Sequence, residues 1–345
     1  MKFKKGPILR ASFFFLFIMI WPFFVGPIFG PLIPVETSLP VRLIITHILM
    51  FILPAIAYIL ITKQSFKKVL KLNKIGGLDI LVAIGIGIIA QPVMAFFAYI
   101  SSFFFTNDVA GMMNDLNTTP LWIMIVMMGV TPSISEEITM RGIVLSGYDF
   151  KNKHIAALMS GLVFGIIHMN PHQFMYAFAM GVIFGYMVRA ANSIYVAMIA
   201  HFVVNTSQLL LQRMLTSMME MMGESTIIDP SAAMQELNSL PLMAKLTTGL
   251  FYGVIALVGF FIISKLIKVF ENTRRKRVRA ELEKNMTGDY VRLDDIESLM
   301  EPSFGINVTR EFNLSKEEIK NEKAVNIPFI IACIIFIYSM VSMVF

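Results

Sequence analysis

Long runs without a charged residue constrain this chain more than any other feature. A helix needs about 20 apolar residues to cross the hydrocarbon core of a bilayer. Runs of that size occupy residues 11–35, 43–62, 80–106, 116–135, 190–212, 246–264 and 324–345, and two shorter runs cover 155–167 and 173–188. The pattern predicts an all-α polytopic membrane protein with about eight or nine transmembrane helices, since only helices or closed barrels satisfy the backbone in lipid.

Composition excludes several other classes of protein. The residues AVILMFWYC make up 56% of the chain and charged residues 15%, against about 25% charged residues in soluble domains. A soluble enzyme or a disordered chain would not carry so much apolar surface. The one cysteine, Cys333, also excludes a disulfide scaffold.

The basic residues predict the topology. With the N-terminus in the cytoplasm, the inner segments hold 25 of the 29 lysines and arginines, as cytoplasmic loops do. These segments are 1–10, 63–79, 149–153, 189 and 265–323. The net charge of +6 is therefore explained by contact with membrane lipids, without a nucleic-acid partner. The apolar chain, rich in Met and Lys, favours a bacterial plasma membrane.

The runs and polar stretches divide the chain into five expected segments. Residues 116–212 carry the chemistry-bearing residues and form the expected catalytic core. The other segments are N-terminal membrane helices in 1–115, an outer loop with a helix in 213–270, a polar cytoplasmic segment in 271–323 and a last membrane helix in 324–345.

A few ionisable or strongly polar residues interrupt the apolar helices. A charge at mid-helix costs roughly 2.5–3.5 kcal/mol on insertion scales, so such residues indicate a functional site. They are Glu136, Glu137, Arg141, His168, His201 and Asn205. Each of these residues alone is also compatible with a buried ion pair that packs two helices, a hydrogen-bonded core histidine or an interhelical hydrogen bond. However, three spans carry such residues at compatible depths.

Helical spacing assigns roles within this set. Glu137 and Arg141 are four residues apart and can pair on one helix face. Glu136 lies about 100° around the helix, without a local partner, and is available for chemistry. His47, in the second run, has no acidic neighbour in the sequence and is interpreted as structural.

Helix rise allows these groups to meet. If the helix ends are near Gly147 and His154, Glu136 lies ~17 Å and His168 ~21 Å from the inner end. By the same rise, Asn205 lies ~17 Å from Ile194. A cluster at mid-membrane is therefore expected.

The residue types favour hydrolysis by direct attack of water. Glu136 would take a proton from the water and His168 would orient it, while His201 and Asn205 would stabilise the oxyanion. Histidines and glutamate also allow a zinc site, but no His-Glu-x-x-His occurs. No serine or cysteine motif accompanies the cluster.

Three short motifs carry a resemblance. Residues 136–141 (EEITMR), 164–168 (FGIIH) and 201–205 (HFVVN) resemble the EExxxR, FxxxH and HxxxN motifs of the CAAX-protease and bacteriocin-processing (CPBP, or Abi) membrane proteins. The three occur in order within about 120–210.

The resemblance implies a glutamic intramembrane endopeptidase related to the Ras-converting CAAX endopeptidase. It places the catalytic groups at Glu136, His168, His201 and Asn205. It gives supporting roles to Glu137, Arg141 and Phe164. It implies no metal or cofactor, and a peptide or lipidated protein as substrate.

Two other classes of function stay open. A non-catalytic bacteriocin-immunity or membrane scaffold protein could use the same helical core. A transporter could use buried Glu, Arg and His residues as a proton relay. The sequence carries no signal for the oligomeric state or for the natural substrate.

Overall fold

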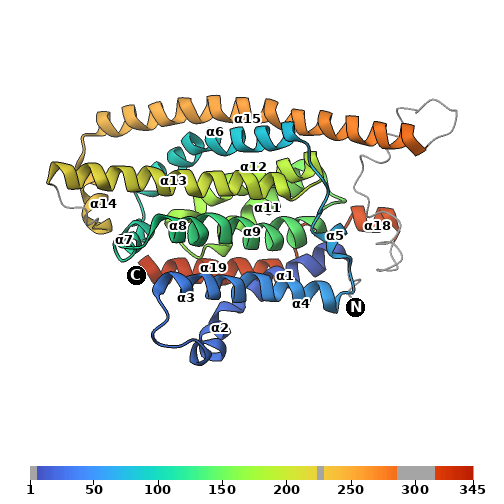
Figure 1. Ribbon diagram of the computed structural model, residues 1–345, viewed down its shortest axis with the longest axis horizontal. Helices are drawn as coiled ribbons and strands as arrows, with labels where there is room; N and C mark the ends of the chain where they lie inside the picture. Colours follow the sequence, from blue (N-terminus) through green and yellow to red (C-terminus); the bar gives the residue numbers. More distant parts are fainter. Residues whose placement is uncertain (1–5, 224–228, 286–314, 345) are drawn as a thin grey trace.

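The chain folds as an elongated bundle of helices that run mostly along one direction (Figure 1). The computed structural model describes residues 6–223, 229–285 and 315–344, and every regular element in these ranges is helical. The predicted all-α class is therefore confirmed. Helix α15 (Leu242–Asn285) lies along one edge of the bundle, and helices α1 (Pro7–Ile20) and α19 (Ile327–Val344) lie toward the opposite edge (Figure 1).

The described residues contain five helices that are long and apolar enough to cross a membrane. These are Leu39–Ile61, Gly77–Ser101 (α6), Leu121–Gly147, Pro171–Ala191 (α12) and Leu242–Lys284 within α15. A sixth is possible if α1 and the segment Pro22–Leu32, bent by 50°, form one span. The predicted count of eight or nine is not confirmed.

The difference in count has a physical reason. Helix α11 (Lys153–Ile167) and the stretch Ile327–Ser342 of α19 are apolar but short. Helix α13 (Tyr195–Met222) is long, but His201, Asn205 and its other polar residues make it less apolar. The apolar runs predicted in α11, α13 and α19 are therefore helical. Each is either too short or too polar to count as a full membrane span.

Two spans are built from several helical pieces. Leu39–Ile61 consists of α3 (Leu39–His47), the π-helix η2 (Ile48–Ile52) and α4 (Leu53–Ile61). Leu121–Gly147 consists, in order, of α8 (Leu121–Met124), π-helix η3 (Ile125–Val130), α9 (Thr131–Glu137), π-helix η4 (Ile138–Val144) and α10 (Leu145–Gly147). Segments of π-helix are rare and often mark functional sites.

Helix α11 packs closely on α12. A Cβ at Gly161 would clash with Val182, and one at Gly181 would lie 2.7 Å from Cα of Gly161. Small residues let membrane helices approach this closely. Helix α12 also packs against α6, α13 and α15, so it is the centre of the bundle.

The segments predicted to be cytoplasmic meet at one end of the molecule. Asp149 accepts hydrogen bonds from Lys71 at 2.8 Å and Arg189 at 2.9 Å, and Asp79 pairs with Arg277. Burial lowers the pKa of Lys71, and the adjacent Asp149 opposes this change. The shared end agrees with the predicted grouping, while the side of the membrane that it faces stays a prediction.

The C-terminal part of the chain is tied to the same end. The Glu322 carboxylate accepts hydrogen bonds from the backbone N–H groups of Ile8 at 3.1 Å and Leu9 at 2.8 Å, in the first turn of α1. Helices α5 (Phe66–Val69) and α18 (Lys316–Lys320) also lie here (Figure 1). Helix α19 packs along α1 as a result.

The opposite end carries α7 (Asp108–Asn114) and α14 (Pro230–Ser239) (Figure 1). There Arg213 of α13 donates to the carbonyl oxygens of Asn117 at 2.5 Å and Thr119 at 2.6 Å, just before α8 begins. Helix α15 continues past the expected boundary at residue 270 and ends at Asn285. Most of the expected polar segment lies outside the described residues, so the division of the chain stays a prediction.

Candidate active site

Glu136 and Glu137 end a short α-helix between two π-helices. Helix α9 follows η3 and precedes η4, so the residue pair lies where the helical register changes twice within about twenty residues. A register change rotates the side chains that follow it relative to those before it. The span thereby presents both carboxylates to neighbouring helices, and both are buried.

Glu137 is the centre of a fully buried ionic network. Its Oε1 accepts a hydrogen bond from Nη1 of Arg141 at 2.8 Å and lies 2.9 Å from Nδ1 of His201. The side chains of Glu137 and Arg141 are both 0% exposed. The pair predicted from the i,i+4 spacing is therefore formed, and it extends to His201 on α13.

Glu136 has partners that the sequence did not suggest. Its Oε1 lies 3.2 Å from Nε2 of His47 at the end of α3, and its Oε2 lies 3.9 Å from Nε2 of His201. His47, interpreted as structural because the sequence shows no acidic neighbour, therefore has one in space. The 89 residues that separate the pair in the chain explain why local spacing could not reveal it.

His168 follows the last residue of α11 and is held in one orientation. Its Nδ1 lies 2.7 Å from the carbonyl oxygen of Phe164, which can only accept a hydrogen bond. Nδ1 therefore carries a proton, and Nε2 of the neutral ring is left with a lone pair. A nitrogen in this state can accept a proton or a hydrogen bond from water.

The ring of Phe164 joins the three motifs. It stands edge-on to His168 at 4.9 Å and to His201 at 5.8 Å between ring centroids. The guanidinium carbon of Arg141 lies 4.1 Å from the centre of the same ring. Two predicted catalytic groups and one predicted supporting residue, from three segments of the chain, therefore surround one side chain.

Asn205 is anchored to the span that carries the glutamates. Its Nδ2 donates a hydrogen bond to the carbonyl oxygen of Met128 at 2.9 Å, within the π-helix η3. An amide nitrogen has two hydrogens, so one is left for another acceptor.

A zinc site, the alternative that the residue types allow, would need His, Cys, Asp or Glu ligands arranged around one point. Within residues 6–223, 229–285 and 315–344, no group of three His, Cys, Asp or Glu side chains is arranged to hold a metal ion. The zinc alternative thus lacks a ligand set in this part of the chain.

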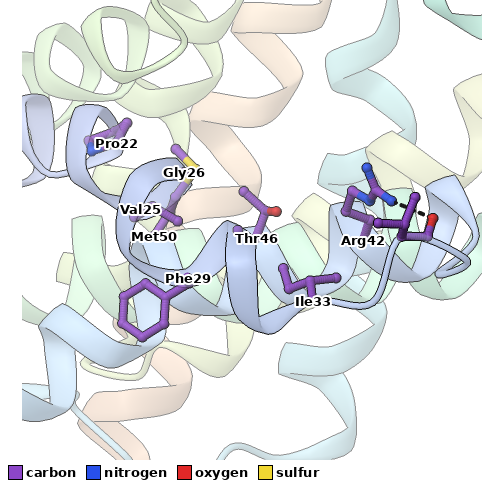
Figure 2. Close-up of a pocket in the computed structure, with 10 residues that line it drawn as sticks. Pro22, Val25, Gly26, Phe29, Ile33, Arg42, Thr46 and Met50 are labelled. Atoms are coloured by element: carbon purple, nitrogen blue, oxygen red, sulfur yellow. Dashed lines mark hydrogen bonds between the residues drawn. The ribbon is translucent and has the colours of Figure 1, made fainter.

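An apolar cavity of about 430 Å³ lies between the bent N-terminal helices and α3 (Figure 2). Its walls include Val25, Gly26 and Phe29 from α2 (Pro22–Phe29), with Thr46 and Met50 on the opposite side. Arg42 lies at one end and donates to the carbonyl oxygen of Val35 at 3.1 Å (Figure 2). Because Thr46 and Met50 flank His47 in the helix, this wall adjoins the residue that contacts Glu136.

Known proteins resemble the segment that holds this cluster. Residues 118–207 match the family model of the type II CAAX prenyl endopeptidases, described as Rce1-like. The chain is 28% identical over 108 residues to "Putative membrane peptidase YdiL" of Bacillus subtilis (strain 168). That alignment covers 31% of this chain and 43% of the relative, so the chain spans less than half of that protein's length. No solved structure matches the chain.

The fold and the cluster define the class of protein. It is an integral membrane protein of α-helices with a buried site of glutamate and histidine side chains. The matched segment contains all three motifs, and over this segment the chain is similar to the type II CAAX prenyl endopeptidases.

Proposed function

We propose that the protein is a metal-independent, glutamic-type intramembrane endopeptidase. It hydrolyses peptide bonds of membrane-associated peptides or protein C-termini. The observation that carries this proposal is the arrangement around Glu136. One carboxylate oxygen is held by His47, the other points toward His201, and His168 offers a free Nε2 beside the same Phe164 ring.

In this mechanism the Glu136 carboxylate removes a proton from a water molecule, which His168 orients through Nε2. The resulting hydroxide attacks the carbonyl carbon of the scissile bond and forms a tetrahedral oxyanion. Glu136 then gives the proton to the amine nitrogen as the C–N bond breaks. The products are a carboxylic acid and an amine, and no covalent intermediate with the protein is needed.

His201 and Asn205 stabilise the oxyanion in this proposal. Because Nδ1 of His201 faces the Glu137 carboxylate, Nε2 is the ring nitrogen left to face the substrate. The loss of one oxyanion donor typically costs about 10²–10³ in rate.

The substrate class follows from the surroundings of the site. The cluster lies in apolar helices, and an apolar cavity adjoins His47 on α3. We propose that this cavity receives an apolar side chain of the substrate. The protein lies in a bacterial plasma membrane with its N-terminus in the cytoplasm, as the basic residues predict.

A comparison of membrane peptides tests the function without a known substrate. Cells with the active protein and cells with the Glu136→Gln variant, at equal protein levels, are compared by mass spectrometry. We expect uncleaved precursors to accumulate and shorter products to disappear in the variant. Identical peptide sets would contradict endopeptidase activity, and a protective phenotype that survives Glu136→Gln would favour the scaffold alternative.

A further inference from the structure

His47 lies outside the segment that matches the family and still contacts the central carboxylate. It is the last residue of α3 and is followed directly by the π-helix η2. All three π-helices in the described residues thus border either His47 or the short helix α9, which ends with the Glu136–Glu137 pair. Since π-helices are rare and often mark functional sites, this placement indicates a role in the chemistry of Glu136.

We propose that His47 is the positioning residue of Glu136 and that Ser135 is the hydroxyl that keeps it in place. This inference rests on the proposed function. The Nε2–H of His47 donates to Oε1 of Glu136 across 3.2 Å, which fixes the carboxylate so that Oε2 faces the attacking water. A hydrogen bond to the ionised form also keeps Glu136 ready to accept a proton.

The hydrogen bonds of Ser135 support two protonation states of His47. Oγ of Ser135 lies 2.8 Å from Nδ1 of His47 and 2.7 Å from the carbonyl oxygen of Thr131. If the hydroxyl donates to Nδ1, the neutral ring carries its proton on Nε2. If the hydroxyl donates to Thr131, Ser135 accepts from Nδ1–H and the ring is an imidazolium. In both states Nε2–H faces Glu136, so a rotation of one hydroxyl lets His47 gain a proton without losing this contact.

The side chain of His47 is less deeply buried than that of His201. Its side chain is 24% exposed, whereas that of His201 is 2% exposed. The other charged or titratable groups of the cluster are Glu137 and Arg141 on the same span as Glu136, with His168 and His201 on neighbouring helices. His47 is therefore less enclosed by the cluster than His201 is.

The test compares purified variants on a peptide that the peptide comparison has identified. We expect His47→Ala to lower kcat by about 10²-fold, the loss typical of a misplaced reacting group, with KM changed little. The acid limb of its pH profile moves to higher pH, because Glu136 has lost a donor to its ionised form. His47→Gln restores a donor and recovers most of kcat, and Ser135→Ala falls between wild type and His47→Ala.

Matched variants separate this inference from the proposed function. His154→Ala removes a histidine whose partner is Tyr186, away from the cluster, and leaves kcat unchanged. An unchanged kcat and acid limb in His47→Ala, with Glu136→Ala inactive, would overturn the inference and leave the proposed function intact. Cleavage by Glu136→Ala would overturn both. If His47→Ala does not fold, a Ser135→Ala variant whose kcat and acid limb both equal those of wild type overturns the inference.

Discussion

Arg141 offers a quantitative test of the buried network. Its guanidinium donates to Glu137 across 2.8 Å, and both side chains are 0% exposed. The variant Arg141→Met keeps most of the apolar volume but leaves the Glu137 carboxylate with His201 alone. Removal of one partner of a buried pair typically costs about 3–5 kcal/mol, because an uncompensated charge remains. We expect the free energy of unfolding to fall by that amount.

A double-mutant cycle separates the pair from its surroundings. The variant Glu137→Gln/Arg141→Met contains neither charge, and we expect it to be more stable than Arg141→Met alone. Unfolding is followed in mixed micelles by titration with denaturing detergent. The control is Lys153→Met, which removes a partly exposed pair with Glu271 at 3.4 Å and should cost no more than about 1 kcal/mol.

Two results would refute this reasoning. If Arg141→Met costs no more than Lys153→Met, the guanidinium does not compensate a buried charge. If the double variant loses the sum of the two single losses, the residues do not interact energetically.

Two further predictions concern the cavity and the C-terminal anchor. A Cβ at Gly26 would meet nothing within 4 Å, so Gly26→Leu should fill the cavity and raise KM with kcat unchanged. The control Gly85→Leu, with equal space in α6, should change neither KM nor kcat. Equal KM values in the two variants would contradict the assigned cavity. Burial raises the pKa of Glu322 above the ordinary 4.5, although the N–H groups of Leu9 and Ile8 oppose this. The contribution of protonated Glu322 to stability is therefore complete below about pH 4.5 and is lost as the pH rises through its folded-state pKa. The melting temperature of wild type relative to Glu322→Gln should fall over that range. A constant difference in melting temperature would contradict this prediction.

The sequence predicted the features that depend on local pattern. Apolar runs identified the helices, and spacing identified the Glu137–Arg141 pair, because residues four apart on one helix are neighbours in any fold. The helix ends near Gly147 and Ile194 also follow from local residues, since α10 ends at Gly147 and Ile194 caps α13.

Features that depend on contacts between distant segments were missed. The contact of His47 with Glu136 joins two spans, and no periodicity within either span reports it. The apolar runs also gave no sign of the π-helices η2, η3 and η4 within these spans. The predicted number of spans is not confirmed, because α13 carries polar residues and α11 is short.

The rate at which purified protein cleaves an identified membrane peptide tests the central claim most directly. Wild type, Glu136→Gln and His168→Ala are compared in proteoliposomes, with folding checked by thermal unfolding of each sample. We predict cleavage by wild type and loss of nearly all activity in both variants, since one lacks the base and the other lacks the group that orients the water. Cleavage at the wild-type rate by both folded variants would contradict the claim.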